Sequence, residues 1–226
     1  MKSIEIFSSN IPEPVFTIAI PTFCRSSLLK EAVFSALNQV TDVPYDVIVV
    51  DNNPERNDET EQLMEQFKDN PLVGYYKNSS NLGMVGNWNQ LFHLAKGQWV
   101  SMLHDDDLLY KNYIRIIHRW LVELDNPQIV CPSYFTSSNR NLLLNSFTES
   151  QGVGRKIMLK SFILGNIIGP PVGMVVNKEF FNKKLKFKEK YYSELVKNGN
   201  LFRISQFDED LLTIENNLDE VDFKKD

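Results

Sequence analysis

The sequence predicts a single α/β domain, a Rossmann-like, mostly parallel sheet flanked by helices. Two short and almost wholly apolar runs, Val15–Ile20 and Tyr45–Val50, are typical of strands buried on both faces, and Pro21 is expected to end the first. Helical segments alternate with such runs, which predicts right-handed strand–helix–strand crossovers. With 226 residues the chain can close one substantial core.

The other elements are expected in this order: a helix at 26–38, a helix at 58–68, a weaker strand at 72–76, a helix at 85–96, a strand at 98–103, a helix at 110–124 and a strand at 129–134. Ser26 or Ser27 can cap the first helix, and Asp58 with Glu61 has capping-box spacing at the second. Gly97 is expected to stop the third helix.

The strand–helix rhythm breaks after about residue 137. Residues 137–156 are rich in Ser, Asn and Gly, which predicts a mobile loop. Residues 208–226 are strongly acidic and are expected to form a flexible tail. One domain is therefore expected over residues 1–207.

Composition narrows the class of protein. The net charge of −5 argues against a general nucleic-acid binder, which needs a basic face, and two cysteines fit a reducing compartment. The first fourteen residues lack the apolar core of a signal peptide, and no run approaches the roughly 20 apolar residues of a spanning helix. These features predict a cytoplasmic protein. They leave peripheral membrane contact and oligomer formation open.

Polar residues follow four of the predicted strands, at the edge of an open parallel sheet where ligands bind. They occupy positions 22–25, 51–53, 78–83 and 104–107. The last group contains three adjacent aspartates, whose mutual repulsion favours a bound cation. Mn²⁺ or Mg²⁺ there could bridge to substrate phosphates. The alternative is a solvated acidic turn that caps the helix near Tyr110.

The other groups support a nucleotide ligand. Asp51 could accept hydrogen bonds from a base or ribose, or could form an Asx turn that closes its strand. Arg25 could pair with a diphosphate or remain solvated. Gly83, two residues after Asn81, could let backbone approach a ligand or could serve a plain left-handed turn. The chain lacks GxSxG, GxxxxGK[ST], HExxH and CxxC patterns, which removes the usual hydrolase, P-loop and zinc alternatives.

Taken in order, these segments resemble the family-2 glycosyltransferases, which have the GT-A fold. The resemblance covers about residues 15–182 and lies in the runs TIAIPTFCR, VIVVDNN, NSSNLGMVGNWNQLFHLAKGQWVSMLHDDDLL and GNIIGPPVGMVVNKEFF. It implies an inverting transfer from a nucleoside-diphosphate sugar, UDP-linked, to a hydroxyl of a glycan or lipid-linked acceptor. Similar bacterial members build surface polysaccharide repeat units, such as O-antigen or capsule.

The resemblance also implies roles for individual residues. The residues expected to contact the donor are Pro21, Thr22, Arg25, Asp51, Asn81, Gly83 and Asp105. The family's Asp-x-Asp motif falls on His104-Asp105-Asp106, so its first aspartate is a histidine here. Asp106, with Asp107 beside it, is expected to bind the metal.

The sequence indicates less clearly which residue deprotonates the acceptor hydroxyl. The family carries an acidic residue shortly before a late helix, often in a Glu-Asp pair, and this chain reads LKFKEKYYSEL there. Glu189 is the first choice for the base and Glu194 the second, with surface glutamates as the alternative. The eroded pattern keeps open a catalytically silent nucleotide-sugar-binding protein. A sugar nucleotidyltransferase is disfavoured because PTFCRSS is not a Gly-rich loop.

Residues 178–190 combine six lysines with four large apolar side chains. They are expected either to form an ordinary amphipathic helix or to rest on anionic lipid near a lipid-linked acceptor.

Overall fold

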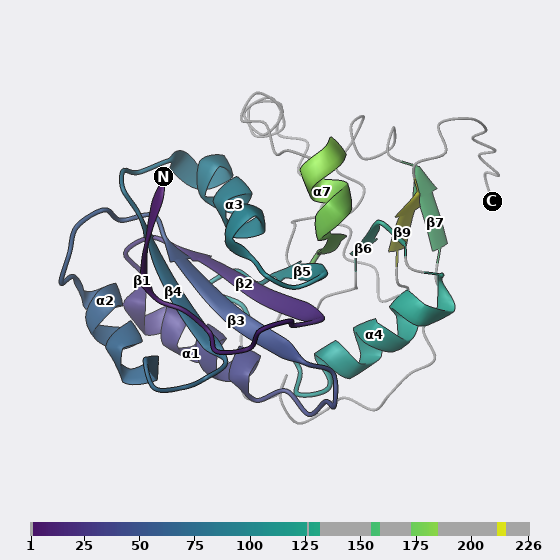
Figure 1. Ribbon diagram of the computed structural model, residues 1–226, viewed down its shortest axis with the longest axis horizontal. Helices are drawn as coiled ribbons and strands as arrows, with labels where there is room; N and C mark the ends of the chain where they lie inside the picture. Colours follow the sequence, from purple (N-terminus) through teal and green to yellow (C-terminus); the bar gives the residue numbers. More distant parts are fainter. Residues whose placement is uncertain (1, 126, 132–154, 159–172, 185–211, 216–226) are drawn as a thin grey trace.

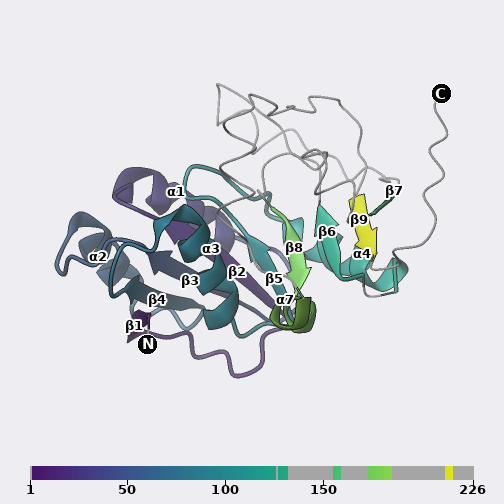
Figure 2. The ribbon, with the colours of Figure 1, turned by 90° about the horizontal axis from the view of Figure 1, so that it is seen from above.

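The computed structural model describes residues 2–125, 127–131, 155–158, 173–184 and 212–215. Within them one sheet of nine strands runs in the order β1-β4-β3-β2-β5-β8-β6-β9-β7, with helices on both faces (Figures 1 and 2). The strands are β1 Ser3–Phe7, β2 Phe16–Thr22, β3 Tyr45–Asp51, β4 Val73–Asn78, β5 Trp99–Met102, β6 Ile129–Cys131, β7 Arg155–Met158, β8 Val175–Asn177 and β9 Leu212–Glu215. The helices are α1 Ser26–Leu37, α2 Glu59–Met64, the 3₁₀ turn η1 Glu65–Phe67, α3 Gly83–Leu94, α4 Tyr113–Glu123 and α7 Lys178–Lys184.

The centre of the sheet is parallel, as predicted. Strands β4, β3, β2 and β5 pair in parallel, and their carboxyl ends therefore lie at one edge. The parallel pattern does not extend to β6, because β8 lies antiparallel between β5 and β6. Strand β1 adds an antiparallel edge beside β4. The sheet is thus mixed around a parallel core, and the predicted α/β architecture is confirmed.

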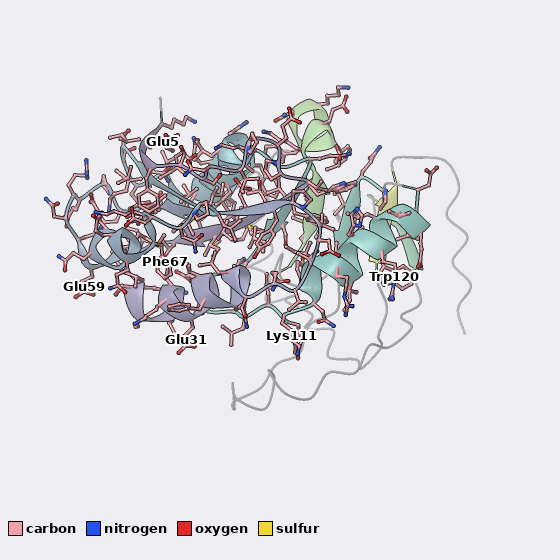
Figure 3. The ribbon with its side chains drawn as sticks, turned by 60° about the horizontal axis from the view of Figure 1, so that its bottom comes forward. Glu5, Glu31, Glu59, Phe67, Lys111 and Trp120 are labelled. Atoms are coloured by element: carbon pink, nitrogen blue, oxygen red, sulfur yellow. The ribbon has the colours of Figure 1, made fainter. Side chains whose placement is uncertain are left out.

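Two hydrophobic clusters cover the two faces of the sheet, because successive side chains of a strand point to opposite faces. In β3, Val47 and Val49 belong to the cluster beneath α1, α2 and α4, whereas Ile48 and Val50 belong to the cluster beneath α3 and α7. Strands β2 and β3 are buried on both faces, which explains why their sequences are almost continuously apolar. Figure 3 views the face of α1, α2 and α4.

The helix starts test the capping predictions. Asp58 caps α2 as predicted, because its Oδ1 accepts a hydrogen bond of 2.9 Å from the backbone N–H of Glu61. The prediction that a serine caps α1 is wrong. Ser26 is already helical, Arg25 is the N-cap residue, and the Ser26 hydroxyl donates instead to Glu59 at 3.1 Å.

Strand β2 continues past the end predicted at Pro21 and stops at Thr22. The β2–β5 ladder ends at Ala19, so the missing N–H of Pro21 interrupts no bond to β5.

Four short strands were not predicted: β1, β7, β8 and β9. Each has three to five residues, and each pairs with segments distant in sequence, so periodicity carries little information about them. Arg155–Met158 begins inside the predicted mobile loop, and Leu212–Glu215 lies inside the predicted flexible tail. The other residues of both segments lie outside the described residues.

Helix α7 is the first part of the segment 178–190, which was predicted either to rest on lipid or to form an ordinary amphipathic helix. Phe180 and Phe181 are buried, and the ring of Phe181 stacks on Phe92 with centroids 4.5 Å apart. These aromatic side chains are therefore held in the core and cannot insert into lipid, which favours the ordinary amphipathic helix for this part. Residues 185–190 lie outside the described residues. No helix in the described part of the chain is long and apolar enough to cross a membrane.

Gly97 gives a testable stability effect. Helix α3 ends at Leu94, and Gly97 lies beyond it, pressed against β2. A Cβ there would meet the backbone of Thr17 at 2.5 Å and that of Phe16 at 2.6 Å. We expect Gly97→Ala to lower the free energy of unfolding by about 1–3 kcal/mol, because the central strand must shift. Urea denaturation checks this, with Gln98→Ala, an exposed neighbour, as the control that should change little. Equal midpoints for both variants would contradict the close approach.

Candidate active site

The four predicted polar groups do gather at the carboxyl edge of the parallel strands. Thr22 ends β2 and contacts the segment after β5, while Asn52 after β3 contacts the segment after β4. The backbone N–H of Asn52 also donates to the Thr22 carbonyl at 2.9 Å. One connected edge therefore carries the residues that the sequence singled out separately.

Asp105 is held between Thr22 and Arg25. The Thr22 hydroxyl donates to Asp105 Oδ2 at 2.8 Å, and Arg25 Nη1 donates to Asp105 Oδ1 at 3.2 Å. The same Arg25 nitrogen lies 3.3 Å from Asp106 Oδ2. Asp105 is buried, whereas the side chains of Arg25 and Asp106 are about half exposed, at 54% and 48%. Arg25 therefore offsets the crowded negative charge from a position that solvent and an anionic ligand can reach.

His104, Asp106 and Asp107 form a group of possible metal ligands. One ligand atom from each lies within 4.8 Å of the others. The Nε2 of His104 is buried and has no hydrogen-bond partner, and the ring stacks on Trp88 with centroids 5.7 Å apart. Burial lowers the pKa of His104, although the three following aspartates act in the opposite direction. A neutral imidazole can donate a lone pair to a cation, so the donor set fits a divalent metal.

His104 was not predicted as a possible metal ligand, because the sequence places it only as a departure from the Asp-x-Asp pattern. The signal was present in the sequence, because histidine is a common metal ligand and stands directly beside three carboxylates.

Asp51 lies at the end of β3 and is fully buried. Its Oδ1 accepts from the backbone N–H of Asn53 at 2.9 Å, which is the Asx turn of the alternative interpretation. Its Oδ2 accepts from the Tyr75 hydroxyl at 3.0 Å and from Lys77 Nζ at 2.8 Å. Burial raises the pKa of Asp51, and Lys77 opposes that rise. Contact between Asp51 and a base would require this segment to move, and it stays a prediction.

Lys77 was not predicted to matter. Its side chain is 1% exposed, and its ammonium pairs with both Asp51 and Asp58, the latter at 3.0 Å. Burying a lysine ammonium without an ionic partner would cost free energy, so the pairs with the two carboxylates explain why Lys77 can be buried. The residue fixes the end of β3 to the start of α2.

The loop between β4 and α3 is held by a chain of amides. Asn52 Nδ2 donates to Asn81 Oδ1 at 2.7 Å, and Asn52 Oδ1 accepts from Asn78 at 2.9 Å and from the Leu82 backbone at 2.9 Å. Gly83 has a φ of 70°, the left-handed conformation of the predicted turn, and its N–H donates to Asn81 at 2.8 Å. Nothing lies within 4 Å of where a Cβ would sit on Gly83, so a ligand could approach its backbone.

Two further features complete the comparison with the predicted site. Phe23, which was not predicted as a site residue, follows β2 directly and is 46% exposed, so that it offers a large aromatic face beside this edge. Pro21 and Thr22 are buried in β2, and only Thr22 makes a side-chain contact with the acidic group. Glu189 and Glu194 lie outside the described residues.

The mostly parallel sheet with helices on both faces has the GT-A fold. S. aureus TarS 1-349 in complex with UDP-GlcNAc has the same fold, with a TM-score of 0.60 and 18% identity over 76% of this chain and 48% of that one. Residues 17–188 match glycosyl transferase family 2. The chain belongs to this family.

Two of the relatives have names that state an activity. The poly(ribitol-phosphate) β-N-acetylglucosaminyltransferase TarP of Staphylococcus aureus is 27% identical over 155 residues, which are 67% of this chain and 42% of TarP. The GalNAc(5)-diNAcBac-PP-undecaprenol β-1,3-glucosyltransferase of Campylobacter jejuni is 34% identical over 99 residues, 42% of this chain and 31% of that protein. The chain thus spans less than half the length of either relative.

Proposed function

We propose that the protein is an inverting glycosyltransferase. It would move a sugar from a nucleoside diphosphate, UDP in the first instance, to a hydroxyl of a glycan or lipid-linked acceptor in polysaccharide biosynthesis. Family membership supports the reaction class, and the two named relatives act on a poly(ribitol-phosphate) polymer and on a lipid-linked glycan. The observation that carries the proposal is the joining of Thr22, Arg25 and the 104–107 group at one edge.

The proposed donor site combines a cation, an arginine and an aromatic face. His104, Asp106 and Asp107 would hold Mn²⁺ or Mg²⁺, which would supply positive charge to the diphosphate. Arg25, already half exposed beside Asp106, is placed to donate hydrogen bonds to a phosphate. Phe23 offers a surface on which a base could stack, and the Gly83 backbone lines the open side of the loop.

The reaction itself is the attack of the acceptor hydroxyl on the donor sugar. Its hydroxyl oxygen attacks the anomeric carbon while a carboxylate takes the proton, and the bond from that carbon to the diphosphate oxygen breaks. Arg25 stabilises the negative charge that builds on the departing diphosphate. Glu189 is our first choice for the proton acceptor and Glu194 our second. The reaction is proposed for the cytoplasm, with peripheral contact at the inner face of the plasma membrane serving a lipid-linked acceptor.

The direct test is turnover. Purified protein is incubated with a panel of UDP-sugars and glycan or lipid-linked acceptors, and released UDP is measured with Mn²⁺, with Mg²⁺ and with excess chelator. We expect acceptor-dependent UDP release that the chelator abolishes. Tight UDP binding with no release for any acceptor would favour the silent nucleotide-sugar-binding protein instead.

The base assignment gives a separate prediction. Glu189→Gln keeps size and hydrogen bonding but cannot take the proton, so turnover should fall by roughly a hundredfold or more while donor affinity stays unchanged. Steady-state rates and UDP calorimetry measure the two effects. Glu179→Gln, on the exposed side of α7, is the control and should keep full activity. Full activity in both Glu189→Gln and Glu194→Gln would show that the base is neither residue.

A further inference from the structure

Helix α1 contacts the segment after β5 at both of its ends. At its N-terminus the N-cap residue Arg25 pairs with Asp105 and Asp106. At its C-terminus, residues 35–40 form hydrogen bonds with the backbone of residues 109–114. The helix has 12 residues and is therefore about 18 Å long, so these are two separate attachments. The acidic residues 105 and 106 lie at the first attachment, and the chain that follows them is held by the second.

Gln39 is central to the C-terminal attachment. Its Nε2 donates to the Tyr110 carbonyl at 2.8 Å, and its Oε1 accepts from the backbone N–H of Ile114 at 3.1 Å. Ile114 lies in the first turn of α4, where backbone N–H groups have no partner within the helix. The N-cap residue Asn112 makes no side-chain cap bond. Gln39 therefore caps α4 from α1 and joins the two helices.

Two neighbours of Gln39 bind the same stretch of chain. The Ser35 hydroxyl oxygen accepts from the backbone N–H of Leu109 at 3.1 Å, and the Val40 N–H donates to the Lys111 carbonyl at 2.5 Å. Both bonds are made to backbone groups of the segment. The backbone directly after the acidic group is thus positioned by the C-terminal end of α1.

The two attachments should respond differently to a bound nucleotide. Arg25 is 54% exposed, and ion pairs of exposed groups contribute little to stability. In the proposed donor site Arg25 donates to the diphosphate, which competes with Asp106 for the same guanidinium. The bonds of Gln39 do not involve Arg25 and can persist. We propose that Gln39 is a positioning residue that holds the acidic group in place when Arg25 pairs with a nucleoside diphosphate.

This inference rests on the proposed function and adds to it a residue outside the donor site. Its test compares a ligand that has a diphosphate with one that lacks it. Gln39→Met keeps the length of the side chain and removes both hydrogen bonds. UDP and uridine are titrated by calorimetry in the same Mn²⁺ buffer. We expect UDP to bind about tenfold more weakly, because the segment must now be ordered on binding, and uridine to bind as before.

A second variant keeps the test independent of the folding of Gln39→Met. Ser35→Ala removes the bond to Leu109 and should also weaken UDP binding, by a smaller factor, with uridine binding unchanged. Gln66→Met is the matched control, because Gln66 is exposed on η1, and it should change neither affinity. Circular dichroism establishes that each variant is folded.

The pattern of affinities separates positioning from a general loosening of the fold. Equal losses for UDP and uridine in both folded variants, or no loss of UDP affinity in either, would overturn the role of Gln39. In both of these cases the wild type still binds UDP more tightly than uridine. A wild type that binds UDP no more tightly than uridine would instead overturn the proposed diphosphate site, and this role of Gln39 with it.

Discussion

Asp106→Ala should abolish metal-dependent nucleotide binding and leave the fold intact. Asp106 belongs to the group of possible metal ligands, and its side chain is 48% exposed, so its loss opens no cavity in the core. Arg25 can still pair with the buried Asp105. Removing a direct ligand should cost at least the 10–100-fold typical of outer-shell changes, and we expect about a hundredfold loss of UDP affinity in Mn²⁺. Calorimetry with and without chelator measures the effect.

The control separates the loss of a ligand from the loss of a charge. Asp69→Ala removes one exposed carboxylate beyond η1, before β4 begins, and so at the opposite end of that strand. It should bind UDP as the wild type does. Undiminished, chelator-sensitive binding by Asp106→Ala would remove Asp106 from the metal site.

Lys77→Ala should destabilise the protein by about 3–5 kcal/mol, the scale for removing one partner of a buried ion pair. The change leaves Asp51 buried at 0% exposure, with only Tyr75 and a backbone N–H to satisfy its charge. It also frees Asp58, which caps α2. The free energy of unfolding from urea denaturation is the measurement.

The pH dependence of this loss has a defined sign. Burial raises the pKa of Asp51 above its unfolded value, and removing Lys77 takes away the charge that opposes the rise. A raised carboxyl pKa favours the folded state when the group is protonated, so this stability is present below the unfolded pKa and is lost as pH rises through the folded one. The deficit of Lys77→Ala should therefore be larger at pH 8 than at pH 5.

Two comparisons make the Lys77 result interpretable. Lys68→Ala breaks an exposed pair with Glu65 and should leave the free energy of unfolding nearly unchanged. Lys77→Met combined with Asp51→Asn removes both buried charges and should recover part of the loss. A cost near that of Lys68→Ala, with no pH dependence, would contradict the buried ion pair.

The parallel half of the fold could be predicted because its strands are buried on both faces. The runs at Val15–Ile20 and Tyr45–Val50 became β2 and β3 to within a residue or two, and the Asp58 cap followed from local spacing alone. The antiparallel half could not. Strand β8 has three residues, and only its pairing with β5 and β6, distant in sequence, makes it a strand.

Only part of the candidate site, like only part of the fold, could be predicted from the sequence. The position of each polar group followed from the strand ends, because parallel strands bring their carboxyl ends together. The partners of each group did not follow. Nothing local in the sequence ties Lys77 to Asp51, or stacks His104 on Trp88, since these contacts depend on the register of neighbouring strands and on the packing of α3.

The most direct test of the proposed donor site is to locate a bound metal ion and a bound nucleotide in the protein. Crystals grown with Mn²⁺ and UDP, measured on the low-energy and high-energy sides of the manganese absorption edge, give an anomalous difference map that locates the ion independently of the protein coordinates. We predict one strong peak in contact with His104, Asp106 and Asp107, with the diphosphate of UDP bound to it beside Arg25. Ordered UDP with no manganese peak at this group, or with the peak elsewhere, would contradict the proposed site.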